Sequence, residues 1–113
     1  MKKPRIQRNL TAAEVARQLP PQYRDRLPRN IARSEKTFAL LLFPHDRDDV
    51  VISAAVRRAL NSWQSTTEDR IIAVAGNFTL EARELLEAAR AIVLRMGDYH
   101  WTDESYKSIQ RTA

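Results

Sequence analysis

Polar side chains that can take part in chemistry follow three apolar runs of this 113-residue chain. The first run is followed by an acidic cluster with one histidine, the second by a Gly-Asn-Phe-Thr turn and the third by a Tyr-His-Trp triplet. Ligands usually bind at the carboxyl ends of parallel strands, so we expect these side chains to line one rim of a sheet. The candidate rim residues are His45, Asp46, Asp48, Asn77, Thr79, Tyr99 and His100.

The acidic cluster allows two interpretations. Carboxylates at a strand end bind Mg²⁺ in phosphoryl-transfer enzymes, so Asp46, Asp48 and Asp49, with His45 as a proton carrier, could form a metal-dependent phosphoesterase or nuclease. Acidic residues at a strand-to-helix junction also cap the helix and complement its dipole. We favour capping, because Arg47 inside the cluster would repel a cation, and we predict neither a metal nor another cofactor.

The turn from Gly76 to Thr79 and the aromatic triplet are also ambiguous. Backbone N–H groups before a helix can bind a phosphate, but the chain has only two glycines and therefore no Walker loop or dinucleotide fingerprint. A turn with Thr79 as helix cap is favoured. Tyr99, His100 and Trp101 offer a surface on which bases could stack, although such aromatics more often pack over a sheet end.

Basic residues are concentrated in the first third of the chain. Residues 1–34 contain nine Lys/Arg and two acids, a net charge of +7, whereas residues 35–113 contain ten and twelve, a net charge of −2. Four of the five prolines lie in the same segment, which predicts an irregular surface arm with one short helix begun by a capping box at Thr11 and Glu14. Basic segments attract phosphates. The candidate nucleic-acid-binding residues are Arg17, Arg24, Arg26, Arg29 and Arg33.

Strand-like and helix-like patterns alternate in the rest of the chain. Apolar runs at 36–43, 71–75 and 91–94 predict strands, and amphipathic segments predict helices at 52–63, after Thr79 and at 103–111. We therefore predict an α/β fold with a small three-stranded, mostly parallel sheet in the order β-α-β-α-β-α, flanked by helices. It forms one domain over residues 35–113, after the basic arm of residues 1–34. The helix after Thr79 should bury Ala82, Leu85, Leu86 and Ala89.

Composition narrows the class of protein. Apolar residues make up 43% and charged residues 29% of the chain, as in globular proteins with a modest core. The absence of cysteine excludes disulfides, thiolate zinc sites and cysteine nucleophiles. No apolar run approaches the ~20 residues of a membrane span or follows the basic start as in a signal peptide. We expect a cytoplasmic protein that neither spans a membrane nor is exported by that route.

One segment resembles a known family. Ile71-Ile-Ala-Val-Ala-Gly-Asn-Phe-Thr-Leu-Glu-Ala-Arg-Glu-Leu, followed by Ala91-Ile-Val-Leu-Arg-Met-Gly-Asp98, is similar to the last strand-helix-strand of Mrr-type restriction-endonuclease-like domains over about a third of the chain. That family's catalytic Asp and Glu-x-Lys lie upstream, but the corresponding strand here, residues 37–43, has no acid and no lysine. The resemblance therefore implies DNA association without cleavage.

Together these patterns predict a non-catalytic, nucleic-acid-associated α/β protein whose basic arm contacts phosphates. Two alternatives remain. A three-stranded sheet is narrow and its edges must be covered, so the chain could be a homo-oligomeric interaction module, most simply a dimer. The metal-dependent phosphoesterase at Asp46, Asp48 and Asp49 is the other. The sequence does not distinguish DNA from RNA.

Overall fold

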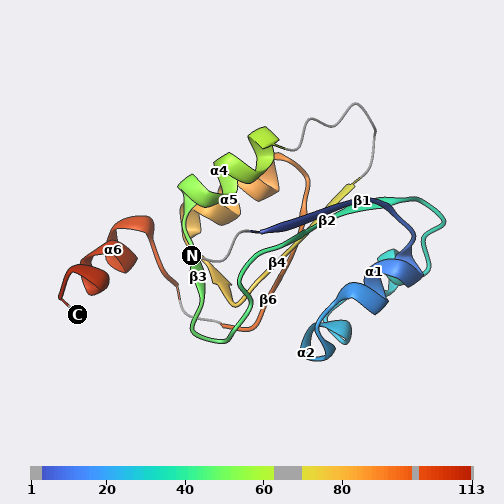
Figure 1. The fold of residues 1–113 in the computed structure, drawn as a ribbon, viewed down its shortest axis with the longest axis horizontal. Coiled ribbons are helices and arrows are strands. Elements are labelled where there is room, and N and C mark those ends of the chain that lie inside the picture. Colours follow the sequence, from blue (N-terminus) through green and yellow to red (C-terminus); the bar gives the residue numbers. More distant parts are fainter. Residues whose placement is uncertain (1–3, 63–69, 98–99, 113) are drawn as a thin grey trace.

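The main sheet has four strands in the order β1-β2-β4-β6 (Figure 1). This arrangement comes from a computed structural model that describes residues 4–62, 70–97 and 100–112. The strands are β1 (Arg5–Leu10), β2 (Phe38–Leu42), β4 (Arg70–Ala75) and β6 (Ile92–Arg95). β2, β4 and β6 are parallel and coincide with the three predicted apolar runs, so the α/β class is confirmed.

β1 is a strand that the sequence pattern does not predict. The sheet has four strands rather than three, because the N-terminal segment pairs antiparallel with β2. The register shifts between Gln7 and Leu10, where Asn9 has a φ of 56°, a left-handed conformation that asparagine adopts more readily than most residues. Ile6 and Leu10 are only half-buried. An edge strand of this kind carries too few apolar residues to be recognised by hydrophobicity.

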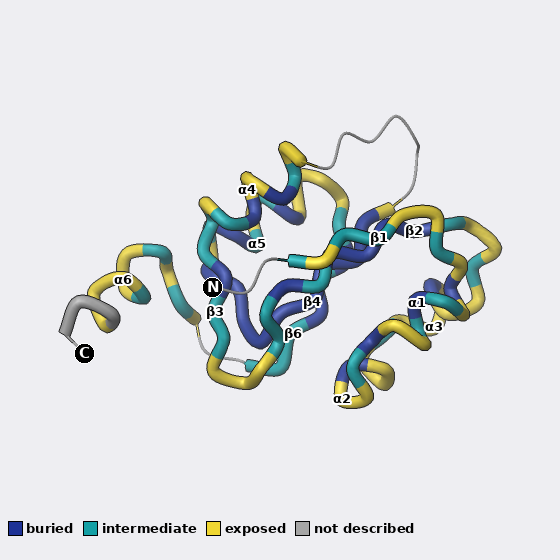
Figure 2. The backbone as a smooth tube through the Cα atoms, in the orientation of Figure 1, coloured by how far each residue is buried: buried dark blue, intermediate teal, exposed yellow. Residues whose placement is uncertain are grey.

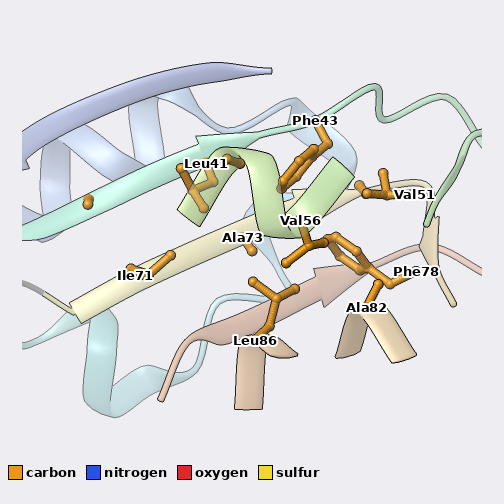
Figure 3. Packing of buried hydrophobic residues seen from close by; sticks show 12 residues of the cluster. Leu41, Phe43, Val51, Val56, Ile71, Ala73, Phe78, Ala82 and Leu86 are labelled. Atoms are coloured by element: carbon orange, nitrogen blue, oxygen red, sulfur yellow. The ribbon is translucent and has the colours of Figure 1, made fainter. Parts of the chain in front are cut away.

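α4 (Ser53–Ser62) and α5 (Leu80–Ala88) cover one face of the sheet and form what we call the C-terminal layer (Figure 1). Val56 and Leu86 from these helices lie in one buried cluster with Leu41, Ile71 and Ala73 of the strands (Figure 3). Both helices were predicted from their apolar spacing, because a helix on a sheet must bury one continuous stripe. Trp63, the last residue of the predicted helix over residues 52–63, lies outside the described residues.

The predicted burial of Ala89 is wrong. α5 ends at Ala88, and Ala89 is its exposed C-cap. The next residue, Arg90, has a φ of 57°, and the N–H of Ala91 donates to the carbonyl of Leu86 at 2.9 Å, which closes a Schellman motif. The helix thus ends one residue before the last position of its predicted apolar stripe.

α1 (Ala12–Gln18), α2 (Pro21–Arg24) and α3 (Arg29–Ala32) cover the opposite face of the sheet and form the N-terminal layer (Figure 1). These helices and Leu19, the C-cap of α1, form a second buried cluster with the sheet; it contains Val15, Leu19, Tyr23, Ile31, Leu40, Ile72 and Val74. The predicted capping box of α1 is confirmed, since Thr11 and Glu14 each accept a hydrogen bond from the other's backbone N–H at 3.2 Å.

Prolines in this layer begin helices instead of preventing them. Pro21 is the first residue of α2, and Pro28 immediately precedes α3. The first residue of a helix needs no hydrogen-bonded N–H, and the fixed φ of proline suits that position. The segment expected to be irregular therefore contains one strand and three short helices.

Three further elements lie near the carboxyl ends of the strands. β3 (Val50–Val51) and β5 (Asn77–Phe78) form a small parallel pair, and α6 (Asp103–Thr112) is the final helix, as predicted. α6 and the N-terminal layer lie at opposite ends of the molecule's longest axis (Figure 1). None of the helices in the described ranges is long and apolar enough to cross a membrane.

Candidate functional site

The loops after β2, β4 and β6 converge on Gly76. Its N–H donates to the carbonyl of Pro44 at 3.3 Å, and its carbonyl accepts from the N–H groups of Met96 and Gly97 at 3.1 and 3.0 Å. The three groups of candidate side chains therefore follow strands that end at one place, as the parallel order predicts. We call this end of the sheet the strand-end rim.

Gly76 is required at the rim because another backbone segment approaches it closely. A Cβ atom at this position would lie 1.9 Å from the carbonyl oxygen of Asp46 and 2.8 Å from that of Asp49. These are backbone atoms, so a small rotation of a side chain cannot relieve the clash. Glycine is needed here because the 46–49 loop packs directly against the backbone of residue 76.

The acidic cluster forms a turn. Asp46 donates its N–H to Oδ2 of Asp49 at 2.8 Å, and the N–H of Asp49 donates to the carbonyl of Asp46 at 2.9 Å. Asp48 is exposed. Within the described part of the chain, no three His, Asp or Glu side chains are grouped so that they could hold a metal ion. The expected helix cap is also absent here, because these bonds close the loop before β3 rather than the start of α4.

Tyr23 connects the N-terminal layer to the rim. Its side chain is fully buried, and its hydroxyl lies 2.9 Å from the carbonyl oxygen of Ala75 and 3.0 Å from that of His45. The rings of Tyr23 and His45 meet edge to face, with centroids 6.3 Å apart. Burial raises the pKa of Tyr23 to about 12, so its hydroxyl stays protonated and able to donate.

Sequence reasoning did not single out Tyr23. A single aromatic residue within a basic, proline-rich segment was the available signal, since every other large apolar residue of that segment is aliphatic. The positive charge of Arg26 and the negative charges of Asp49 and Asp46 all act on the Tyr23 hydroxyl. The basic segment and the acidic turn therefore meet at this residue.

Asn77 and Thr79 are buried and hold the local backbone. Oδ1 of Asn77 accepts from the N–H of Phe78 at 2.9 Å. The Thr79 hydroxyl accepts from the N–H of Ala82 at 3.2 Å, which confirms Thr79 as the cap of α5. The N–H of Leu80 donates to the carbonyl of Trp101 at 2.7 Å. These bonds occupy N–H groups that a phosphate would need.

Asp103 ties α6 to the starts of α4 and α5, a role that the sequence did not reveal. Its carboxylate accepts from the backbone N–H of Ser53 at 2.9 Å, from the Ser53 hydroxyl and from the Thr79 hydroxyl at 2.6 Å. Its own N–H donates to Oε2 of Glu81 at 2.8 Å. Burial alone would raise the pKa of Asp103, but the hydrogen bonds from Ser53 and Thr79 hold it below its ordinary value.

Trp101, the last residue of the aromatic triplet, packs against α6. His100 is exposed, and Tyr99 lies outside the described residues. The Trp101 and Tyr106 rings pack edge to face with centroids 5.6 Å apart. Because α6 and the N-terminal layer lie at opposite ends of the molecule, this aromatic pair is not beside the candidate arginines (Figure 1).

The five candidate arginines all lie in the N-terminal layer, and all are exposed. Apolar residues of α1, α2 and α3 face the sheet, and the five arginines are exposed (Figure 2). The side chains of Arg24, Arg26, Arg29 and Arg33 form no hydrogen bond or ion pair with any other described residue. We call Arg17, Arg24, Arg26, Arg29 and Arg33 the basic surface.

Comparison with protein-family models, with curated proteins and with solved structures found no match for this chain, so the function must be argued from its own geometry.

Proposed function

We propose that this chain binds nucleic acid without catalysing a reaction on it, and that the basic surface contacts the phosphates. One observation carries the proposal: Arg24, Arg26, Arg29 and Arg33 of the N-terminal layer are exposed and have no acidic partner among the described residues, whereas Arg17 lies near the carboxylate of Glu14. Guanidinium groups bind phosphate oxygens in a bidentate manner, and exposed, unpaired ones need not give up another interaction first.

Phosphate contacts of this kind give affinity rather than sequence preference. The described aromatic pair that could add base stacking lies at the other end of the molecule, and Tyr23 within the N-terminal layer is fully buried. Binding should therefore depend strongly on salt, because each neutralised phosphate releases counterions. Contacts from all five arginines would give a slope of log affinity against log salt of about −4.5 on duplex DNA.

Fluorescence anisotropy tests the proposal with labelled duplex and single-stranded DNA and RNA, between about 50 and 200 mM salt. Deleting residues 1–34 would remove β1 and uncover one face of the sheet, so substitutions are the better probe. Arg24→Ala/Arg26→Ala should weaken binding. Arg57→Ala/Arg58→Ala is the matched control, since it removes two exposed arginines from α4 in the C-terminal layer. Equal losses in the two variants would show that only net charge matters and would contradict the proposal.

Self-association is the second candidate, and one observation favours it. Leu80 is 45% exposed and Ile109 is 51% exposed, whereas the other large apolar side chains described are buried or half-buried. Exposed apolar residues mark protein–protein contacts when they form a patch. Light scattering over a range of concentrations tests this candidate: the wild type should form a dimer that Ile109→Glu disrupts. A wild type that stays monomeric throughout would reject it.

A further inference from the structure

α2 is too short to fix its own orientation. It has four residues, and its N-cap, Pro20, provides no side-chain hydrogen bond. An isolated single turn is not stable in water, so tertiary contacts must hold it. Tyr23 is the buried residue of this helix. The contacts of Tyr23 therefore decide how α2 and the residues after it are presented.

Those contacts are made with the end of a central strand and with the loop beside it. The Tyr23 hydroxyl lies between two carbonyl oxygens, one from Ala75 at the end of β4 and one from His45 in the loop after β2. Ala75 is fully buried in a central strand that is paired on both sides. Losing the hydroxyl would leave a buried carbonyl without this donor and the helix without its polar anchor.

Two residues of the basic surface are attached directly to this anchor. Arg24 follows Tyr23 within α2, and the N–H of Arg26 donates to the Tyr23 carbonyl at 3.0 Å. Both guanidinium groups are exposed, so the protein fixes their backbone but leaves their side chains accessible. A fixed backbone lowers the ordering cost that binding would otherwise incur.

We propose that Tyr23 is a positioning residue for phosphate binding: by pinning α2 to the strand-end rim, its hydroxyl holds Arg24 and Arg26 where both can contact one nucleic-acid backbone. This inference rests on the function proposed above. It also defines where the surface ends, since the negative charges of Asp46 and Asp49 act on the same hydroxyl and would repel phosphates beyond it.

Tyr23→Phe tests this role, because it removes the hydroxyl and keeps the ring. Affinity for duplex DNA, measured by anisotropy, should fall about tenfold, and the salt slope should become shallower by about 1 to 2 as two phosphate contacts are lost. Tyr106→Phe is the matched control: it alters a half-buried tyrosine of α6, at the opposite end of the molecule, and should leave both values unchanged.

A double-mutant cycle separates positioning from general stabilisation. If Tyr23 acts through Arg24 and Arg26, adding Tyr23→Phe to the Arg24→Ala/Arg26→Ala variant should weaken binding little further. If Tyr23 only stabilises the fold, its effect should be the same in both backgrounds and the salt slope should not change, which would overturn the inference. Circular dichroism below the melting temperature confirms that each variant is folded.

Failure of the inference and failure of the proposed function give different results. Wild-type binding that Arg24→Ala/Arg26→Ala weakens, but Tyr23→Phe does not, rejects the positioning role alone. A wild type that does not bind, or that loses equal affinity through Arg57→Ala/Arg58→Ala, rejects the proposed function and the inference with it.

Discussion

The two helical layers bury the sheet in the same way but present different surfaces to solvent. α4 and α5 contain three Lys/Arg and three acids, so the C-terminal layer is neutral. Residues 11–36, which form the N-terminal layer, contain six Lys/Arg and three acids, a net charge of +3. Covering a sheet needs an apolar inner side only. The excess of arginine on one layer is therefore not required by the fold, and the proposed binding of phosphates would account for it.

The layers also differ in how they are held to the strand-end rim. The N-terminal layer reaches it through one buried hydroxyl, that of Tyr23. In the C-terminal layer, the rim residue Thr79 and the start of α4 are joined to α6 by the carboxylate of Asp103. One attachment is buried and uncharged and the other is charged and only half-buried. The attachment at Tyr23 should therefore weaken at alkaline pH, and the attachment at Asp103 should weaken at acidic pH.

Gly76→Ala should have the largest effect, because the rim supports both layers. The added Cβ would meet two backbone carbonyls of the 46–49 loop, and we expect the free energy of unfolding to fall by about 3 kcal/mol or more. Urea denaturation measures it. In the control, Gly97→Ala, the Cβ would lie 3.0 Å from Nδ2 of Asn77, which is the end of a side chain, so a loss of about 1 kcal/mol is expected. Equal losses would contradict the argument from close approach.

Asp103→Ala should release α6 from the C-terminal layer. It removes a charged acceptor of three hydrogen bonds, so we expect a loss of about 2 kcal/mol in unfolding free energy. Hydrogen exchange should increase at the start of α4 and in α6 while α1 stays protected. Exchange that rises equally in both layers would show that Asp103 supports the whole fold.

Acidic pH should destabilise the wild type in the same way as Asp103→Ala, because it protonates the Asp103 carboxylate. The folded pKa of Asp103 lies below its ordinary value of 3.8, so the carboxylate stabilises the fold above that pH, and its contribution is lost as the pH falls below it. Asp103→Ala should lack this part of the acid dependence. An identical acid titration of stability in both proteins would exclude the linkage.

Tyr23→Phe should lower the free energy of unfolding by about 1 kcal/mol and should destabilise only the N-terminal layer. The pKa of Tyr23 is raised from 10 to about 12 in the fold, so the unfolded chain ionises first and wild-type stability should decline as the pH rises through this interval. The phenylalanine variant should lack that decline. Unfolding free energies measured across this alkaline range provide the check, and parallel curves would contradict it.

Arg90→Gly should have the smallest effect and the opposite sign. Arg90 occupies the left-handed position after α5, with a φ of 57°, which glycine adopts without steric cost. We expect the free energy of unfolding, measured by thermal denaturation, to rise by about 0.5–1 kcal/mol, with the stabilisation confined to the C-terminal layer. Arg90→Ala removes the same side chain without relieving the backbone, so a similar gain there would show that the charge, not the conformation, was responsible.

Local patterns in the sequence were sufficient for the parallel strands, α1, α4, α5 and α6. Each has either a continuous apolar run or an apolar stripe, and Thr11 and Thr79 mark helix starts through bonds that reach only three residues along the chain. β1 and the short helices α2 and α3 have no such signal. β1 is held by its pairing with β2, and α2 and α3 are held by burying Tyr23 and Ile31 against a sheet that is formed by distant residues.

The candidate site divides in the same way. The sequence was sufficient to identify the arginines and to predict that the three loops meet at one rim. Charge and the order of the strands can both be recognised from residues that are neighbours in the chain. Only the tertiary structure showed that Tyr23 joins the basic surface to the rim and that Asp103 bonds to Ser53. Tyr23 and its acceptor Ala75 are 52 residues apart in the chain, and Asp103 and Ser53 are 50 residues apart. Contacts between distant residues leave no periodicity and no spacing for a local pattern to detect, so folding alone decides them.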